Sequence, residues 1–444
     1  MLGEVAPAGG SAALRTRADA EAYVASVCFK HGPPRLLGVE LEWLVHPAAA
    51  PAAPVDAATL RAALGPHAPR SLDPRSPARP LPGGSTVTVE PGGQVELASP
   101  PLAALGRLVR TVAADVETLH ARLARHHLAV EPRAADPLRP PHRVLDLPRY
   151  RAMERRFDRV GPAGRSGMCS TAAVQVCLDA GEGADVADRW AALHALGPVL
   201  LAAFANSPLL HGRRTGWKSS RTACWLTLDP RRTAPPAPAT GDPAVAWARR
   251  VVDTELLCVR RADQWDVPDG VTFADWVDGA LDPPPTRADL DYHVSTLFPP
   301  VRPHGHLEVR YVDAQPGRQW ALPVAVLAAL LSDPDRTAQA RRACAPAAGR
   351  WVSAARHGLA DRVLQRAAVT VFELAVAALP ALEPPSWLVD DLAVVLERRV
   401  RRGLCPADLD APDRDAPDRD APDPAAPHHP LSTVPIADRE EASA

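Results

Sequence analysis

The string GVELEWLV, near the N-terminal end of the chain, constrains the fold more than any other segment. Its alternation predicts a β-strand in which Val39, Leu41 and Trp43 share one face. Glu40 and Glu42 fall on the other face, with no basic residue between them. Such a pair is more often a solvated strand face, but adjacent carboxylates repel one another unless a cation lies between them. The strand therefore offers one face to a core and one face to a divalent metal.

A second acidic segment, TVEPGGQVELA, strengthens the metal interpretation. Its Pro-Gly-Gly turn joins two alternating runs, 85–90 and 94–98, and predicts a hairpin. Glu90 and Glu96 flank the turn. Because Mg²⁺ and Mn²⁺ prefer oxygen ligands, several carboxylates on adjacent strands could hold more than one ion.

Two further strands place polar residues among apolar ones. In HLEVRYVD, Glu308 and Arg310 share a strand face with His306. Alone, a Glu-x-Arg pair is most often a structural ion pair; beside metal and phosphate, Glu308 would be a ligand and Arg310 would meet phosphoryl charge with its planar fork of donors. In STAAVQVCLD, Gln175 is either a satisfied buried amide or a neutral oxygen ligand.

Composition excludes several classes of protein. With 444 residues and a net charge of −2, the chain can bury a large core and has no general attraction for nucleic acid or an anionic membrane. Its seven cysteines include no CxxC pair, which fits a reducing compartment. The longest apolar runs, 191–205 and 321–331, are shorter than the ~20 residues of a spanning helix. We expect a cytoplasmic protein with no nucleic-acid or membrane partner.

Periodicity and composition divide the chain into a flexible leader (1–20), one large domain (21–405) whose C-terminal third is mainly helical, and a disordered Asp/Pro/Ala-rich tail (406–444). The tail repeats Asp-Ala-Pro-Asp and is too poor in apolar residues to form a core. Strands are predicted over 36–45, 85–90, 94–98, 128–132, 170–179 and 306–312. Helices are predicted over 17–30, 57–64, 101–127, 149–158, 185–206, 243–253, 270–280, 319–331, 335–348, 359–379 and 386–402.

Five strings together resemble the glutamate–cysteine ligase family of the plant and actinobacterial type, which is related in fold to glutamine synthetase. They are GVELEWLV, TVEPGGQVELASPP, MCSTAAVQVCLDAG, FANSPLLHGRRTGWKSSRTACW and TLFPPVRPHGHLEVRYVDAQPGRQWALPV, and they span about 36–330. The wording of GWKSSR and EVRYVD is most similar to the actinobacterial enzyme that begins ergothioneine biosynthesis.

The resemblance implies an α+β fold: a glutamine-synthetase-like curved antiparallel sheet with flanking helices and the active site on its concave face. It implies ATP and Mg²⁺ as cofactors, with Mn²⁺ as an alternative. The implied ligands of one metal ion are Glu42, Glu90 and Glu96, and those of another are Glu40, Gln175 and Glu308.

The resemblance also implies roles for basic and aromatic residues. Arg310 would neutralise the transferred phosphoryl charge, and Arg221 with Trp225 would grip glutamate or phosphate. Lys218 and Arg302 would contact the nucleotide or phosphate. His293 lies in a matching segment, among the substrate-binding residues, without an assigned role.

The implied reaction joins the γ-carboxylate of L-glutamate to the amine of L-cysteine through γ-glutamyl phosphate, with ATP converted to ADP and phosphate. A ligase with another amine acceptor, a guanidino-type phosphotransferase and a degenerate ligase retained as a scaffold are the alternatives. The substrates are small molecules, and the oligomeric state stays open, with a monomer as one expectation.

Overall fold

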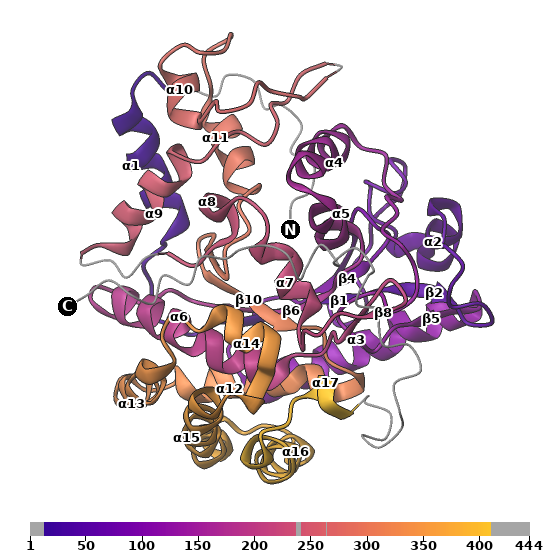
Figure 1. The fold of residues 1–444 in the computed structure, drawn as a ribbon, viewed down its shortest axis with the longest axis vertical. Helices are drawn as coiled ribbons and strands as arrows, with labels where there is room; N and C mark the ends of the chain where they lie inside the picture. The colour runs from indigo at the N-terminus through magenta and orange to yellow at the C-terminus, as the bar shows by residue number, and fades with distance from the viewer. Residues whose placement is uncertain (1–12, 237–240, 263, 410–444) are drawn as a thin grey trace, which may run out of the picture.

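The computed structural model of the protein describes residues 13–236, 241–262 and 264–409. Its centre is an antiparallel sheet of six strands in the order β3–β4–β1–β6–β10–β9 (Figure 1). The strand bounds are Thr86–Val89 (β3), Val95–Ala98 (β4), Leu37–Trp43 (β1), Ala173–Leu178 (β6), Leu307–Asp313 (β10) and Val301–Pro303 (β9). Two short pairs lie outside this sheet: β2 (Val45–Pro47) with β5 (Leu128–Val130), and β7 (Leu209–Leu210) with β8 (Arg213–Arg214).

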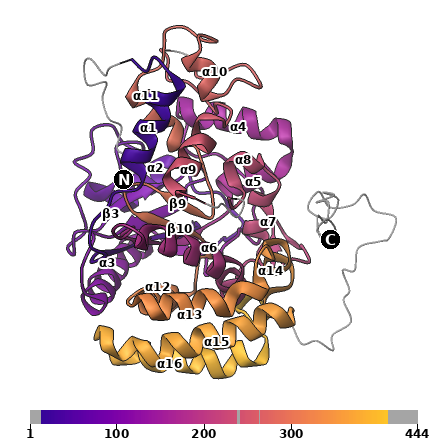
Figure 2. The ribbon, with the colours of Figure 1, turned by 90° about the vertical axis from the view of Figure 1, so that its left-hand side faces the viewer.

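One face of the sheet packs against helices and forms the main core. The apolar residues of the alternating β1 segment, Val39 and Leu41, are each 1% exposed. Figure 2 shows α12 and α13 lying between the sheet and an outer layer of α15 and α16. The helices on this face are α3 (Leu105–Arg125), α6 (Asp185–Phe204), α12 (Ala321–Leu330), α13 (Pro334–Cys344), α14 (Trp351–His357), α15 (Arg362–Ala378) and α16 (Ser386–Arg398). Every residue of α12 is buried, as expected of a helix that is apolar on all sides.

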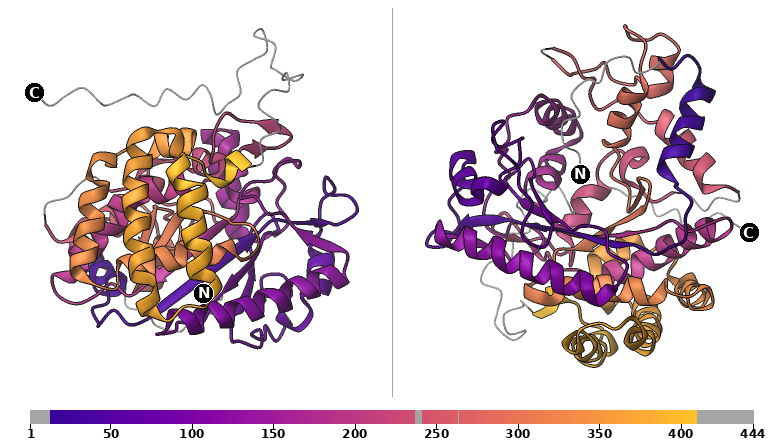
Figure 3. Two further views of the ribbon diagram at one scale, coloured as in Figure 1. Left: turned by 90° about the horizontal axis from the view of Figure 1, so that it is seen from below. Right: turned by 180° about the vertical axis from the view of Figure 1, so that it is seen from behind.

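The opposite face of the sheet carries two groups of helices (Figures 1 and 3). One group contains α1 (Arg17–Cys28), α8 (Pro230–Thr233), α9 (Pro243–Val252), α10 (Phe273–Val277) and α11 (Arg287–Val294). The other contains α4 (Pro148–Val160) and α5 (Pro162–Cys169). Helix α7 (Ser220–Leu226) contacts both α5 and β10, and α2 (Ala57–Leu64) packs against α3. Short 3₁₀ turns complete the chain at Gly65–His67, Gly317–Trp320, Ala345–Ala347, Gly358–Ala360, Leu379–Leu382 and Val400–Arg402.

The predicted α+β class and the antiparallel sheet with flanking helices are confirmed. The predicted helices and strands also agree in type with those observed, because the helical and strand periodicities are both strong in this sequence. Helix α2 has the predicted bounds. The strand predicted over 36–45 is divided into β1 and β2, which pair with different partners.

The predicted leader is shorter than expected. Leu14, placed in a loose leader over 1–20, is 4% exposed, and its backbone N–H donates to the Pro285 carbonyl at 2.8 Å. Helix α1 begins at Arg17, where the Thr16 side chain caps its first turn. An apolar side chain and a cap are enough to fix these few residues against α11; residues 1–12 lie outside the described residues.

The predicted tail also begins later than expected. Residues 406–409, which we placed in a disordered tail over 406–444, form a short helix, α17. Its Ala407 is buried and donates its backbone N–H to the Ala205 carbonyl at 3.0 Å. Residues 406–409 precede the charged repeats, so the composition that predicts disorder does not apply to them. The rest of the predicted tail, 410–444, lies outside the described residues.

One helical segment, Arg362–Leu382, is long and apolar enough to cross a membrane by length and composition. Half of its most apolar window is buried inside the protein, where α15 packs against α12, α13 and α16. Burial in this helical layer accounts for its apolar character.

The turn between β3 and β4 is fixed against the end of α5 and the segment that follows it, and it positions two of the predicted metal ligands. Gly93 adopts a φ of +86°, which favours glycine. Gly92 has no space for a side chain, because a Cβ there would lie 2.1 Å from the carbonyl oxygen at the end of α5. The Gln94 side chain accepts from the Gly92 N–H and donates to the carbonyl of Thr171, both at 2.9 Å. The turn between the two glutamates is therefore attached to the segment that joins α5 to β6.

We expect Gly197→Ala to destabilise the fold by about 1–3 kcal/mol through overpacking. Gly197 lies inside α6, and a Cβ there would lie 2.0 Å from the Trp351 ring. Urea unfolding of the variant measures the loss. Gly32→Ala is the matched control, because a Cβ at Gly32 meets nothing within 4 Å. Equal stability of the two variants would contradict the packing described for α6 and α14.

Candidate active site

Strand register brings the predicted ligands onto one face of the sheet. Glu42 lies opposite Glu96 across β1 and β4, and Glu40 lies opposite Gln175 across β1 and β6. On β10, Glu308 lies opposite Arg302 of β9 and Cys177 of β6. These residues alternate with the core residues of the same strands, so they point away from the helical layer. Strands β1, β4 and β10 thus gather acidic side chains that lie far apart in the sequence.

Gln175 is the contact point between two of the carboxylates. Its Nε2 donates to Glu42 Oε1 at 2.8 Å and reaches Glu96 Oε2 at 3.5 Å. Glu42 Oε2 accepts from the Ala173 backbone N–H at 2.8 Å, and Glu96 Oε1 accepts from the Thr88 hydroxyl at 2.6 Å. Gln175 is 2% exposed, so its amide is satisfied inside the acidic cluster.

Two arginines hold the carboxylate at the other end of the cluster. Arg302 binds Glu308 through Nε at 2.6 Å and Nη2 at 3.1 Å, a two-point contact. Arg310 donates to Glu308 Oε1 at 3.0 Å and to Gln175 Oε1. Burial alone would raise the pKa of Glu308, but the two guanidinium groups hold it well below its usual range. Glu308 is therefore ionised, and Arg310 links it to the rest of the cluster.

The other carboxylates of the cluster form no ion pair with an arginine in the described residues, and their pKa values are raised. Burial, with the charges of Glu96 and Glu308, raises the pKa of Glu40 to about 8. Burial and the charge of Glu90 raise the pKa of Glu42 to about 7 and that of Glu96 to about 8. Burial also raises the pKa of Glu90. Within the described residues, neither Glu40 nor Glu90 has a hydrogen-bond donor to its carboxylate.

The oxygen donors of these carboxylates suit a hard divalent cation, but their present arrangement does not form a coordination site. Among residues 13–236, 241–262 and 264–409, no three His, Cys, Asp or Glu side chains surround a common point as ligands would. The Gln175 amide and Arg310 occupy the space between them. Buried, mutually repelling carboxylates with raised pKa values are the groups that a cation would neutralise. A bound ion would require the amide of Gln175 to move.

A second buried network fixes the backbone behind Arg310. Asp313, fully buried at the end of β10, accepts from the Asn206 N–H at 2.8 Å and from the hydroxyls of Ser207 at 2.8 Å and Ser219 at 2.9 Å. Arg221 lies 3.8 Å from Asp313 and donates to the Arg310 carbonyl at 2.8 Å. Arg221 therefore lies next to the acidic cluster, where it contacts Asp313 and the backbone of Arg310.

Sequence reasoning assigned no role to Asp313. It ends the HLEVRYVD string, but its partners come from the Ser-rich segment before α7, and nothing in the spacing of the two segments shows that they meet. The signal available was its position: Val312 and Asp313 follow a β-bulge in the pairing of β10 with β6. That bulge alters the alternation after Val309, so simple strand patterning could not place the residue.

The structure places Lys218 away from the acidic cluster. Its Nζ binds Asp408 of α17 at 2.5 Å, and its backbone N–H donates to the Ala355 carbonyl of α14. The segment before α7 contacts the C-terminal helices α14 and α17, and Lys218 is part of that contact. That Lys218 contacts the nucleotide or phosphate stays a prediction.

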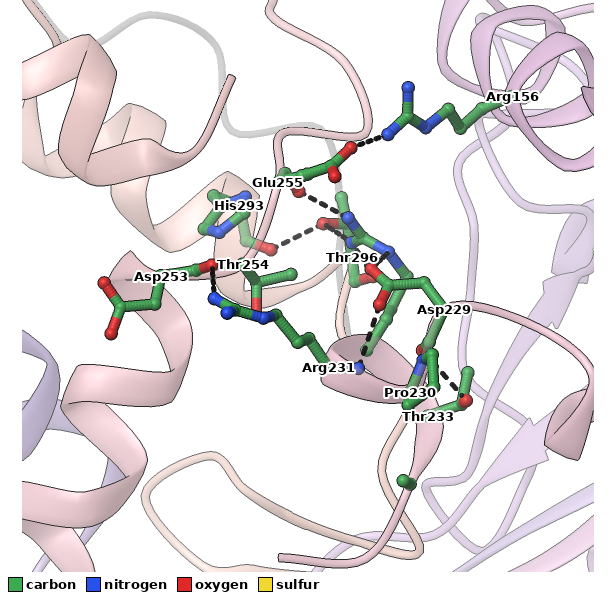
Figure 4. Close-up of polar contacts among 12 residues, drawn as sticks. Arg156, Asp229, Pro230, Arg231, Thr233, Asp253, Thr254, Glu255, His293 and Thr296 are labelled. Carbon is green, nitrogen blue, oxygen red and sulfur yellow. Dashed lines mark hydrogen bonds and ion pairs between the residues drawn. The ribbon is translucent and has the colours of Figure 1, made fainter. Parts of the chain in front are cut away.

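His293 likewise lies outside the acidic cluster, in the interior of the α8–α11 group (Figure 4). It is 2% exposed, its Nε2 contacts the Val251 carbonyl at 2.9 Å, and burial lowers its pKa to about 3. A neutral buried imidazole of this kind supports packing. Trp225 of α7 packs against Phe298 with ring centroids 5.2 Å apart, in a small apolar cluster between the two helix groups.

Comparison with known proteins gives matches over the same region of the chain. Residues 36–411 match the family described as Glutamate-cysteine ligase family 2 (GCS2). The glutamate–cysteine ligase EgtA of Mycolicibacterium smegmatis is 44% identical over 335 residues, which cover 74% of this chain and 78% of that protein. The chloroplastic glutamate–cysteine ligase of Nicotiana tabacum is 32% identical over 265 residues, or 54% of this chain and 48% of that protein. A glutamate–cysteine ligase of Francisella tularensis, solved in complex with AMP, gives a TM-score of 0.46 at 14% identity over 85% of this chain and 84% of that one.

We expect Mg²⁺ to raise the melting temperature more at about pH 8.5 than at about pH 6. In the metal-free protein, Glu40, Glu42 and Glu96 have pKa values raised above 4.5, so their contribution to stability is present below 4.5 and is lost as the pH rises to about 8. The cation binds the ionised forms and reverses that loss. Thermal unfolding with Mg²⁺ or EDTA measures the difference.

Glu96→Gln is the control for this pH effect, because it removes one titrating ligand and should flatten the dependence. A gain that is equal at both pH values, or greater at the lower one, would contradict the assignment of these carboxylates to a cation.

Proposed function

Because the chain belongs to glutamate–cysteine ligase family 2, we propose that it joins the γ-carboxylate of L-glutamate to the amine of L-cysteine, with ATP converted to ADP and phosphate. The observation that carries the proposal is the convergence of the acidic cluster with Arg302 and Arg310 on one face of the sheet. The product would be γ-glutamylcysteine, and its proposed use is the first step of ergothioneine biosynthesis, in the cytoplasm.

The chemistry requires two anions to approach one another. A carboxylate does not react with an amine in water, so the glutamate γ-carboxylate first attacks the γ-phosphorus of ATP and forms an acyl phosphate. Arg310 is available to meet the phosphoryl oxygens, because it lies beside Gln175 and Glu308 with its planar fork of donors. Arg302 balances the charge of Glu308 from the other side. The cysteine amine then displaces phosphate and forms the amide.

We propose that the acidic cluster holds Mg²⁺, or Mn²⁺, in two sets. Glu42, Glu90 and Glu96 would form one set, and Glu40, Gln175 and Glu308 the other. When bound, the ions would neutralise phosphate charge. The raised pKa values of Glu40, Glu42 and Glu96, together with the adjacent placement of the strands that carry them, support this assignment.

Arg221 and Asp313 have a positioning role in this proposal. Their contacts hold the carbonyl of Arg310 and the end of β10, so they determine where the Arg310 guanidinium lies. Trp225 remains a proposed substrate contact. No described residue identifies the thiol of cysteine, and a ligase for another amine is therefore the second candidate.

We expect phosphate release from ATP to require both glutamate and an amine, with cysteine the best of a panel of amino acids. Glu42→Gln should lower this rate by about 10²-fold or more, because it removes a charged ligand from the phosphoryl-transfer site. Glu117→Gln, an exposed acid on α3, is the matched control and should retain the full rate. A phosphorylated product formed without amine would contradict ligation; preference for another amine would change the acceptor alone.

Arg310→Lys should lower kcat by about 10²-fold with a smaller effect on KM for ATP. Lysine keeps the charge but cannot contact Gln175, Glu308 and a phosphoryl group together. Arg318→Lys, which alters an exposed pair with Asp391, is the control. Steady-state kinetics of both variants decide the point, and an unchanged kcat for Arg310→Lys would remove Arg310 from the proposed chemistry.

A further inference from the structure

The short helix α17, drawn in yellow in Figure 1, is the last described element of the chain, and it contacts two segments that are distant from it in sequence. Its Ala407 donates the backbone N–H to the carbonyl of Ala205, directly after α6, at 3.0 Å. Its Asp408 accepts through Oδ1 from Nζ of Lys218, in the segment before α7, at 2.5 Å. One turn of helix therefore holds the end of α6 and the start of α7 together.

Both of these segments bind the buried carboxylate of Asp313 at the end of β10. After α6, Asn206 donates its N–H and Ser207 its hydroxyl, each at 2.8 Å. Before α7, Ser219 donates its hydroxyl at 2.9 Å, and it is the residue next to Lys218. The two segments also contact each other, because the Ser207 N–H donates to the Lys218 carbonyl at 3.0 Å. The position of the end of β10 therefore depends on two segments that α17 joins.

The carboxylate of Asp408 is bound through both oxygens. Its Oδ2 accepts from the Cys405 N–H at 3.0 Å and from the Cys405 thiol at 3.1 Å, while Oδ1 binds Lys218. Burial would raise the pKa of Asp408, but these donors hold it below its usual range, so the side chain is ionised. The Asp408 side chain is 11% exposed, which makes this ion pair a stronger constraint than a solvated surface pair.

We propose that Asp408 is a positioning residue for Arg310, and that its effect passes through the segment before α7 to Asp313. The inference rests on the proposed function, which assigns Arg310 to the phosphoryl group. Asp313 and Arg310 lie on the same strand, and Arg221 of α7 donates to the Arg310 carbonyl at 2.8 Å. Movement of the segment before α7 would therefore displace the Arg310 guanidinium. A displacement of ~1 Å at a reacting group can cost ~10²-fold in rate.

Asp408→Asn tests the inference, because asparagine keeps an oxygen for the Cys405 N–H and loses the ion pair with Lys218. With glutamate and cysteine saturating, we expect kcat for phosphate release to fall about fivefold or more, with KM for ATP nearly unchanged. In an Arg310→Lys background, the same substitution should change kcat by less than about twofold, because the group that it positions is already altered. Equal losses in the two backgrounds would overturn the positioning role.

Lys218→Met removes the other charge of the pair. Its kcat should fall as in Asp408→Asn, and the double variant should lose no more than either single variant. A raised KM for ATP in Lys218→Met, with Asp408→Asn unaffected, would make Lys218 a direct nucleotide contact and overturn the inference. Glu397→Gln, which alters an exposed pair with Arg401, is the matched control and should retain the full rate.

Amide hydrogen exchange of β10 in the full chain separates this inference from the proposed reaction, because it needs no substrate. We expect the amides of β10 to exchange about threefold or more faster in Asp408→Asn than in the wild type or in Glu397→Gln. Strand β4, which pairs with β3 and β1, is the internal reference and should not change. Faster exchange in β10 supports the coupling even if the wild type shows no ligase activity, an outcome that would remove the proposed reaction alone. Unchanged exchange in β10 would overturn the inference.

Discussion

The structure depends on how one face of a β-sheet balances buried negative charge. Arg302 and Arg310 balance the charge of Glu308, and the Gln175 amide donates hydrogen bonds to Glu42 and Glu96. The carboxylates without such partners respond through raised pKa values. An uncompensated set of this kind is costly for stability in a metal-free protein, which is the reason to regard it as a binding site and not as packing.

The rest of the fold maintains that face. Apolar residues of the same strands are buried against helices: β10 contacts α6, β6 contacts α12, and β1 contacts α3. The β3–β4 turn is attached through Gln94 to the segment between α5 and β6, and the end of β10 is attached through Asp313 to the segment between α6 and α7. These contacts involve loops as well as strands. Together with the strand register, they fix the positions of the acidic side chains.

Much of this could be predicted from the sequence, for identifiable reasons. Alternation in GVELEWLV and EVRYVD separates a core face from a polar face, and it placed Glu40, Glu42 and Glu308 together. Arg310 lies where the pairing shifts and still contacts Glu308. The family assignment is confirmed over residues 36–411. Periodicity has no information about long-range contacts, however. It could not show that Lys218 binds Asp408, that His293 is buried among α8–α11, or that Asp313 anchors the loop before α7.

Anomalous diffraction from crystals grown with Mn²⁺ and a non-hydrolysable ATP analogue tests the central claim most directly. The account predicts Mn²⁺ peaks between Glu42, Glu90 and Glu96 and beside Glu40 and Glu308, with the triphosphate in contact with Arg310. Mn²⁺ and nucleotide bound at another surface, with the Gln175 bridge still joining Glu42 and Glu96, would contradict it.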